Sequence, residues 1–168
     1  MEIYKDLLVA EVRRRLFVEN IPRLKKCLGE LSEEEIWYRP NEHSNSVGNL
    51  VLHLCGNVRQ WLIAGLGGYP DTRQRQTEFD ERGPVPTQKL IALLDQLQED
   101  AEQTLNEISL QQILSPVKVQ GFQETGLSLL IHVVEHFSYH AGQVTYFVKW
   151  RKDKDMGYYS GQNLNVTS

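Results

Sequence analysis

The sequence predicts an all-α protein, a four-helix bundle formed by a single domain. Three observations support this fold class. Four long segments repeat apolar residues at helical spacing, no two segments look like partner strands, and 168 residues are enough for one domain with a buried core. We assign residues 1–160 to this domain and expect residues 161–168 to form a frayed C-terminal tail.

The first helix is expected over about residues 3–28, with a run of arginines on its solvent side. Pro22 lies inside this pattern, so we expect it to kink the helix or to divide it. A short capped turn follows, with Ser32 as the N-cap and Glu35 at the capping-box position.

The second helix should begin at a serine cap, either Ser44 or Ser46, and end at a glycine cluster. Its apolar stripe places His53 near the inner side of the helix. The polar, proline-containing stretch over residues 69–86 is then expected to be a long surface connection, with one turn of helix around Phe79.

The third helix is expected from Thr87 to about Ile108. Residues 117–121 have the composition of a strand, but no partner strand is evident, so we interpret them as an extended connection. Long connections therefore follow helices two and three. Thr125 should cap the fourth helix, which runs without interruption to about Arg151.

Composition narrows the possible functions. The apolar and charged fractions, 40% and 24%, are those of an ordinary soluble protein, and a net charge of −4 argues against a nucleic-acid partner. No apolar run reaches the ~20 residues of a membrane span, and the N-terminus lacks a signal-peptide core, so we expect a cytoplasmic protein without a membrane partner. Cys27 and Cys55 fit small buried hydrophobic residues better than a disulfide framework.

Three of the five histidines lie on the fourth helix, at His132, His136 and His140. A step of four residues turns about 40° beyond a full helical turn, so neighbouring members of this ladder share a face. The first and third members are about 80° apart, so one pair is better placed than the triplet to bind a single metal ion. Another part of the chain must then complete the site.

The remaining histidines, His43 and His53, are the candidates for a further ligand. His43 lies in a polar loop, whereas His53 lies on an apolar helical face and must there either bond a buried group or bind a metal. Neutral imidazoles in a three-ligand site with an open position suit zinc, and nickel or iron(II) almost as well.

Other residues near these histidines fit the site less well. Cys55 is about 200° around the helix from His53, and Glu135 is about 100° from His136, which suits a supporting or surface role. The segment from His132 to His136 also matches the inverted zinc-peptidase pattern His-x-x-Glu-His. That short motif occurs by chance, and we do not favour a peptidase.

Two motifs together resemble the DinB superfamily, which includes YfiT-like proteins. The first is SVGNLVLHL from Ser46 to Leu54, followed by Trp61; the second is His136-x-x-x-His140 followed by Ala-Gly-Gln. The resemblance covers about residues 3–152. Members of this superfamily are described as metal-dependent hydrolases or thiol-dependent transferases, and some have no metal.

The resemblance implies a four-helix bundle, commonly a homodimer, with a divalent metal held by His53, His136 and His140. His132 matches no ligand position and becomes a candidate for lining the pocket or for a core hydrogen bond. The characterised relatives use a low-molecular-weight thiol as a co-substrate, so such a thiol is expected here together with a small-molecule substrate.

The leading hypothesis is therefore an enzyme whose divalent metal (zinc, nickel or iron) activates a bound water or thiol. No general base is singled out among the catalytic candidates Glu135, His132, Tyr139 and Gln143, and Gln143 can also brace the site by hydrogen bonding. The alternative is a non-catalytic dimeric bundle that binds a metal or a small ligand.

Overall fold

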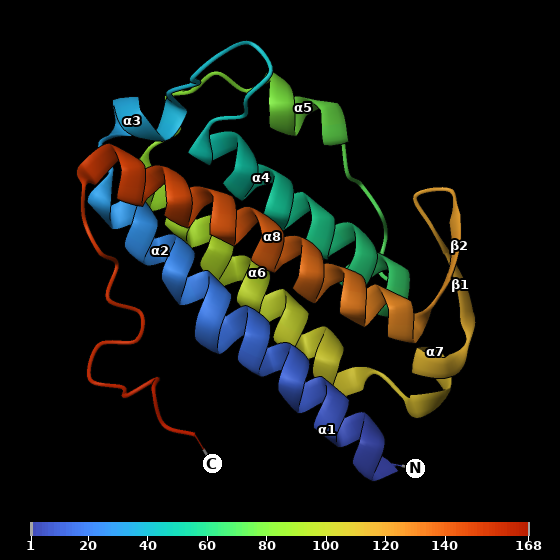
Figure 1. The fold of residues 1–168 in the computed structure, drawn as a ribbon. Helices are drawn as coiled ribbons and strands as arrows, with labels where there is room; N and C mark the ends of the chain where they lie inside the picture. Colours follow the sequence, from blue (N-terminus) through green and yellow to red (C-terminus); the bar gives the residue numbers. More distant parts are fainter. Residues whose placement is uncertain (1, 168) are drawn as a thin grey trace.

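The computed structural model describes residues 2–167 and confirms the all-α bundle. Four helical rods lie side by side in Figure 1. The first comprises α1 (Glu2–Arg13), η1 (Arg14–Asn20) and α2 (Ile21–Glu30), the second α4 (Val47–Val58) and η2 (Arg59–Leu66), the third α6 (Thr87–Glu107) and the fourth α8 (Gly126–Lys152). Short helices decorate the connections: α3 (Glu33–Trp37), α5 (Arg75–Asp80) and α7 (Leu110–Leu114).

The caps predicted for three helix starts are confirmed. Ser32 and Glu35 form the expected capping box of α3. Of the two serines proposed for the second rod, Ser46 is the N-cap, and its hydroxyl accepts from the backbone N–H of Asn49. Thr125 caps α8 in the same manner. Helix α5, which contains Phe79, is the turn of helix expected in the long connection.

Pro22 does not break the first rod. The chain instead passes through the π-helical segment η1 immediately before it and continues as α2, with Pro22 in the first turn. A wider turn before the proline leaves room for its ring and for the carbonyl that its missing N–H cannot satisfy. The side-chain amide of Asn20 donates to the carbonyl of Arg15, which closes this segment.

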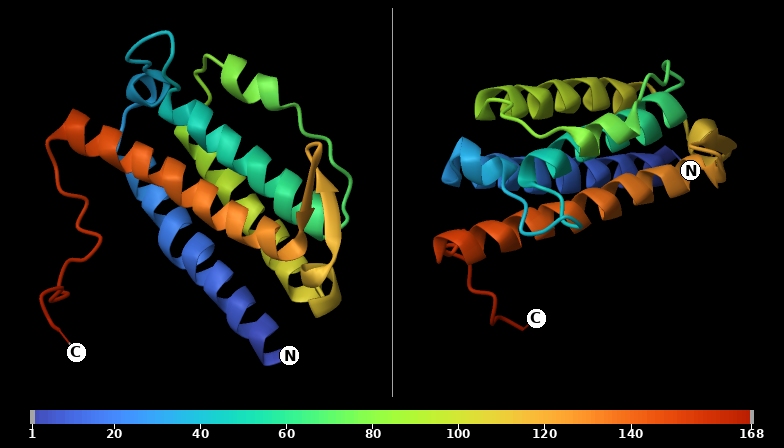
Figure 2. Two further views of the ribbon diagram at one scale, coloured as in Figure 1. Left: turned by 45° about the vertical axis from the view of Figure 1, so that its right-hand side comes forward. Right: turned by 90° about the horizontal axis from the view of Figure 1, so that it is seen from above.

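The interpretation of residues 117–121 as an extended connection is wrong. Strands β1 (Pro116–Val119) and β2 (Phe122–Thr125) pair in an antiparallel hairpin, with Val119 opposite Phe122. The two turn residues, Gln120 and Gly121, have φ angles of 50° and 85°, as a tight hairpin turn of the primed type requires. Figure 2 shows the hairpin at one end of the bundle, beside η2 and the start of α8.

The core runs along the centre of the bundle, between the four rods. Its largest fully buried side chains are leucines, isoleucines and Phe137 from all four rods and from α3. Cys27 and Cys55 are buried within it as free thiols, as expected. Burial raises the pKa of Cys55 to about 12, so this thiol stays protonated. The apolar faces of the rods therefore fix their mutual packing, and with it the position of His53 on α4.

The C-terminal segment docks against the bundle before it reaches the tail. Met156 is buried, and Lys26 donates to its carbonyl oxygen at 2.5 Å. The hydroxyl of Tyr158 lies 2.9 Å from that of Thr145. Residues 161–167 are exposed, while the ends of the expected domain and tail, at residues 1 and 168, lie outside the described residues.

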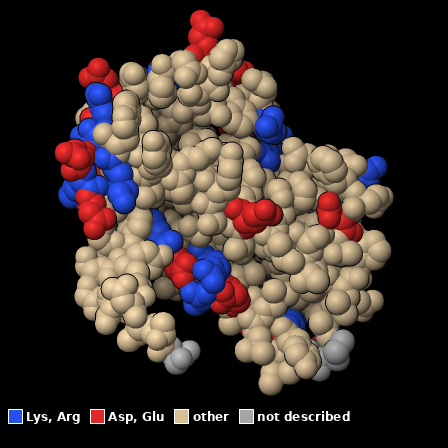
Figure 3. Space-filling model, viewed as in Figure 1, with Lys and Arg blue, Asp and Glu red and all other residues tan. Residues whose placement is uncertain are grey.

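Acidic and basic side chains are mixed on the face drawn in Figure 3. On the first rod, Arg14 and Arg15 pair with Glu11. Near the end of α8, Lys152 and Lys154 pair with Glu35 and Glu30. No helix within residues 2–167 combines the length and the apolar run needed to cross a membrane.

Candidate metal centre

Helices α4 and α8 bring three histidines together. His53 of α4 is buried, and His136 and His140 of α8 are half-buried. One ring nitrogen from each of the three lies within 4.8 Å of the other two. Helix α4 packs against α8, and the ring of His53 lies with its centroid 4.9 Å from that of His136 and 5.2 Å from that of His140.

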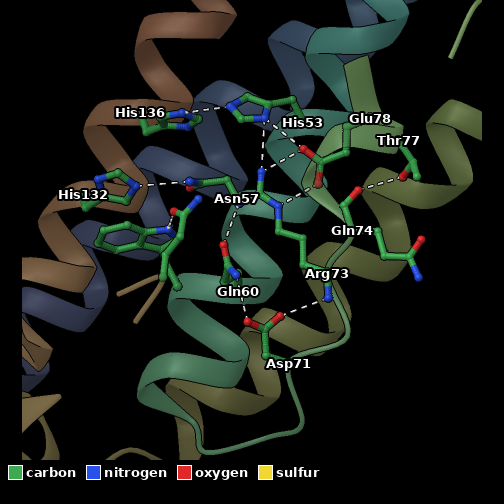
Figure 4. Close-up of polar contacts among 12 residues, drawn as sticks. His53, Asn57, Gln60, Asp71, Arg73, Gln74, Thr77, Glu78, His132 and His136 are labelled. Carbon is green, nitrogen blue, oxygen red and sulfur yellow. Dashed lines mark hydrogen bonds and ion pairs between the residues drawn. The ribbon is translucent and has the colours of Figure 1, made fainter. Parts of the chain in front are cut away.

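The closest contact in this group joins two Nε2 atoms. His53 Nε2 lies 3.1 Å from His136 Nε2 (Figure 4). A divalent ion about 2.1 Å from each of two nitrogens, at a tetrahedral or right angle, separates them by about 3.0–3.4 Å. The observed spacing is therefore compatible with a shared metal ion.

A carboxylate fixes the orientation of His53. Glu78 Oε2 lies 3.0 Å from His53 Nδ1, on the side of the ring away from His136. Arg73 Nε and Nη2 donate to the two carboxylate oxygens at 2.7 and 2.8 Å. Although Arg73 Nη2 is also 3.1 Å from His53 Nδ1, the carboxylate is the acceptor that both groups share. Nδ1 then carries the proton, and Nε2 keeps a lone pair for a metal.

Glu78 is ionised in this environment. Burial raises its pKa, but the hydrogen bonds from Arg73 and His53 and the charge of Arg73 outweigh burial, so the pKa lies below its ordinary value. The side chains of Arg73 and Glu78 are only 4% and 10% exposed, so their ion pair is shielded from solvent. A charged acceptor beside Nδ1 makes the far nitrogen of His53 more basic.

The backbone around Glu78 is tied to α4. Asn49, fully buried in the first turn of α4, donates to the carbonyl oxygens of Glu78 and Glu81, each at 2.9 Å. Gly56 lies one turn beyond His53, where a Cβ atom would overlap Glu78 Oε1 and approach Arg73 Nε to 2.9 Å. The glycine therefore leaves the space that the carboxylate and guanidinium occupy.

Gln143 positions His140. Its Oε1 lies 2.8 Å from His140 Nδ1, one helical turn earlier, and this hydrogen bond favours a proton on Nδ1. His140 Nε2 is then the nitrogen with a free lone pair. The bracing role predicted for Gln143 matches this geometry.

The histidines of α8 are neutral at physiological pH. Burial lowers the pKa of His136 to about 3, with further lowering by the nearby His140, His53 and His132. Burial also lowers the pKa of His140. Neutral imidazole is the form that binds a metal. Within the described residues, His136 Nδ1 is buried without a hydrogen-bond partner.

His132 lies outside the three-histidine group. Its ring stacks on Trp61, with centroids 3.7 Å apart, and its Nε2 lies 3.2 Å from the side-chain amide nitrogen of Asn57. The structure thus places it both on a pocket wall and in a hydrogen bond, the two roles proposed for it. His53, Asn57 and Trp61 follow one another at steps of four, and the π-helical winding of η2 keeps Trp61 on the same side as Asn57.

The other sequence candidates lie at the margin or elsewhere. Tyr139 is 63% exposed, with its ring 5.0 Å from that of His140. Glu135 is exposed and faces α1, where it lines a groove with Arg15. His43 is exposed in its loop, as expected. The three-histidine group does not include Cys55.

Sequence reasoning missed three residues of the site, namely Glu78, Arg73 and Asn57. The first two come from the long connection, whose irregular composition has no period that relates it to α4. Asn57 did carry a signal, because it lies four residues after His53 and so shares its face. The four-residue spacing predicted neighbouring site residues on α8, but it was not applied to His53 and Asn57 on α4.

Comparisons with known proteins give a family and a fold. A family model described as protein of unknown function (DUF1572) matches residues 7–161. A comparison with curated proteins found no match.

Among solved structures, the DinB-like protein YjoA of Bacillus subtilis is 17% identical, with a TM-score of 0.65 over 89% of this chain and 94% of that one. A conserved protein of Enterococcus faecalis is 16% identical, with a TM-score of 0.70 over 89% and 97%. A DinB-like protein of Bacillus cereus is 15% identical, with a TM-score of 0.63 over 81% and 88%. These likenesses show a shared fold.

Proposed function

Because the chain belongs to the DUF1572 family, a DinB-like family, we propose that it is a metal-dependent enzyme with one divalent ion held by His53, His136 and His140. The observation that carries this proposal is the convergence of three ring nitrogens within 4.8 Å. Two of these imidazoles are further oriented through their Nδ1 atoms, by Glu78 and by Gln143. Such oriented, neutral imidazoles are the ligands of metal sites that retain an open position.

The proposed reaction is hydrolysis or transfer to a low-molecular-weight thiol. A divalent ion such as zinc, nickel or iron(II) in this group would supply Lewis acidity that lowers the pKa of a water or thiol. The surrounding residues orient the ligand imidazoles, because Glu78 hydrogen-bonds His53 and Gln143 hydrogen-bonds His140. The stacked rings of Trp61 and His132 form a wall that would shield the ion. Tyr139 and Gln143 remain candidates for contacting a substrate.

Metal analysis tests the ligand set. Protein purified without a nickel column should contain about one equivalent of metal per chain, and His140→Ala should lose most of it because two imidazoles hold an ion much more weakly than three. His132→Ala is the matched control, because it removes a histidine of the same helix that lies outside the group, and it should retain the metal.

The ligand set is refuted if His136→Ala combined with His140→Ala keeps full metal content. The reverse pattern, with loss in His132→Ala and retention in His140→Ala, would support the inverted peptidase motif instead. A panel of thiols and electrophiles, run with and without chelator, then separates a metal-dependent enzyme from a bundle that only binds metal.

A further inference from the structure

A cavity of about 340 Å³ opens beside the histidine group, where α4 and α8 meet the β1–β2 hairpin. His53 and His136 are among its lining residues, so a molecule inside it would lie next to the proposed metal ion. The side chains that give the rest of the lining its chemistry are Asn57, Trp61, Arg75 and Phe122. We call this space the Trp61 cavity, and its volume has room for a small organic molecule.

We infer that the Trp61 cavity binds a small aromatic acid that carries an O–H or N–H at the end of the ring away from the acid group. An aromatic wall selects the ring, a buried oxygen selects the hydrogen-bond donor, and an arginine without an ion-pair partner selects the acid. The identity of this ligand as the substrate rests on the proposed function, whereas its binding does not.

Aromatic side chains form the wall that would hold the ring. Trp61 is 6% exposed, and its indole stacks on the imidazole of His132 with the ring centroids 3.7 Å apart. Phe122 comes from the hairpin, and its ring centroid lies 6.3 Å from that of Trp61. Because Phe122 is 57% exposed, a flat apolar ligand in the cavity would remove apolar surface of this side chain from water.

A buried oxygen of the lining lacks a hydrogen-bond donor. Asn57 is 4% exposed, and its side-chain nitrogen lies 3.2 Å from His132 Nε2. Its Oδ1 has no hydrogen-bond partner within residues 2–167. Burying a carbonyl oxygen without a partner costs free energy, which an O–H or N–H of the ligand would recover.

Arg75 gives the outer part of the cavity a positive charge. Its guanidinium carbon lies 4.8 Å from the centre of the Phe79 ring, and it has no ion-pair partner among the described residues. Arg75 is exposed whereas Asn57 is buried, so the acid group of the ligand would lie outward and its donor inward. A carboxylate is the group that a guanidinium binds with two parallel hydrogen bonds.

The other charged side chains of the lining already have partners. Arg73 is paired with Glu78, and both are shielded from solvent. Glu124 accepts from the hydroxyl of Ser128 at 2.7 Å and lies just before the start of α8, where the helix dipole stabilises a negative charge. Arg75 is therefore the charge in this lining that a ligand would complement.

Isothermal titration calorimetry of the full-length protein, both metal-free and zinc-loaded, tests this ligand class. The probe is para-hydroxybenzoate, which combines an aromatic ring, an O–H and a carboxylate at opposite ends. Two analogues of similar size each lack one feature: para-fluorobenzoate has no donor, and para-hydroxybenzamide has no charge. We expect one molecule of the probe to bind per chain, and each analogue to bind roughly tenfold more weakly, in both forms of the protein.

Three variants assign the parts of the probe to the cavity. Asn57→Leu should remove the preference for para-hydroxybenzoate over para-fluorobenzoate, and Arg75→Gln should remove the preference for the acid over the amide. Phe122→Ala should weaken all three ligands about three- to tenfold. Lys118→Gln removes an exposed cation of the hairpin that does not line the cavity, so this control should leave all three affinities unchanged.

Equal affinities of the three ligands for the wild-type protein, or no binding at all, would overturn the inferred ligand class. Preferences that survive in Asn57→Leu and Arg75→Gln would overturn it as well, because the probe would then be held elsewhere. Arg75 and Phe122 are exposed, so their variants test the cavity even if Asn57→Leu fails to fold.

The two forms of the protein separate this inference from the metal proposal. Binding that requires zinc and is unchanged in Arg75→Gln would mean that the carboxylate coordinates the ion, which would overturn the inferred orientation and support the metal site. Protein that holds no zinc would refute the proposed function, while both preferences in the metal-free protein would still support the ligand class.

Discussion

Glu78 connects a surface segment to the chemistry of the bundle interior. It is one of the few charged side chains buried in this structure, and both of its carboxylate oxygens are used by Arg73 while one also accepts from His53. A buried ion pair is costly unless its hydrogen bonds are satisfied, and here the carboxylate has donors on both oxygens. The carboxylate lies beside His53, a proposed metal ligand, so orienting that imidazole would account for the cost of burial.

Replacing Glu78 by Gln should weaken metal binding about 10- to 100-fold. The amide oxygen can still accept from His53 Nδ1, but the negative charge that raises the basicity of Nε2 is gone. The metal dissociation constant is measured by competition with a chelator, after circular dichroism has verified the helical content. Asp80→Asn, an exposed change on the same short helix, is the control, and equal affinities in the two variants would contradict a positioning role for Glu78.

At the level of elements, helix α4 is shaped to receive this carboxylate. A glycine inside a helix costs about 0.5–1 kcal/mol relative to alanine, so Gly56 needs a compensating reason. The reason is the close approach of Glu78 and Arg73 to the helix backbone. The site therefore depends on the absence of a side chain at Gly56 as well as on the side chains of Glu78 and Arg73.

Gly56→Ala should lower both stability and metal affinity, even though alanine is the better helix former. The new methyl group must displace the carboxylate from His53, and leaves Arg73 and Glu78 with poorer hydrogen bonds. Gly29→Ala is the matched control, because a Cβ atom there meets nothing within 4 Å, and it should be neutral or stabilise by up to about 1 kcal/mol. Urea unfolding of the metal-free proteins and chelator competition give the two readouts, and equal behaviour of the two variants would refute the steric argument.

The hairpin shows why one element escaped prediction. Gln120 has a left-handed backbone conformation, with φ 50°, at a turn position where Asn or Gly is usual. The residues of β2 are mostly polar, so they do not show the composition of a strand. The hairpin is held by its tertiary contacts: Val119 is buried, and Trp61 Nε1 donates to Gln120 Oε1 at 3.1 Å. A local pattern does not contain these partners.

For the whole molecule, the spacing of apolar residues was sufficient to predict each long helix that packs one face into the core. It predicted the four rods and the shared side of His136 and His140, and it placed His53 on an apolar helical face. The starts of the second and fourth rods were predicted from their cap residues. The spacing did not predict Glu78 or Arg73, because the path of residues 69–86 is set by tertiary contacts, such as those of Asn49 with the backbone in and just after α5. The three proposed ligands lie on regular elements, whereas the residues that orient and surround them lie partly on irregular ones.

Ion pairs also join distant parts of the chain. Helix α3, which follows the first rod, is tied to the end of α8 by Glu35, which accepts from Lys152 at 2.6 Å and from Arg151 at 3.2 Å. The same carboxylate accepts from the backbone N–H of Ser32 in the capping box. Because α3 precedes the loop that leads into α4, this contact helps to fix one end of the bundle.

The Glu35 contact should make part of the stability depend on pH. Its hydrogen bond with Lys152, followed by that with Ser32, lowers the pKa of Glu35 from 4.5 to about 2. A lowered folded-state pKa contributes stability that is fully present above pH 4.5 and is lost as the pH falls toward 2. Glu35→Gln keeps the capping acceptor but removes the charge, so it should cost at most about 1 kcal/mol at neutral pH, since solvent screens the pair. Urea unfolding across this range should show the difference from wild type shrinking as the pH falls, whereas Glu34→Gln, an exposed neighbour without a polar contact among the described residues, should show no such trend.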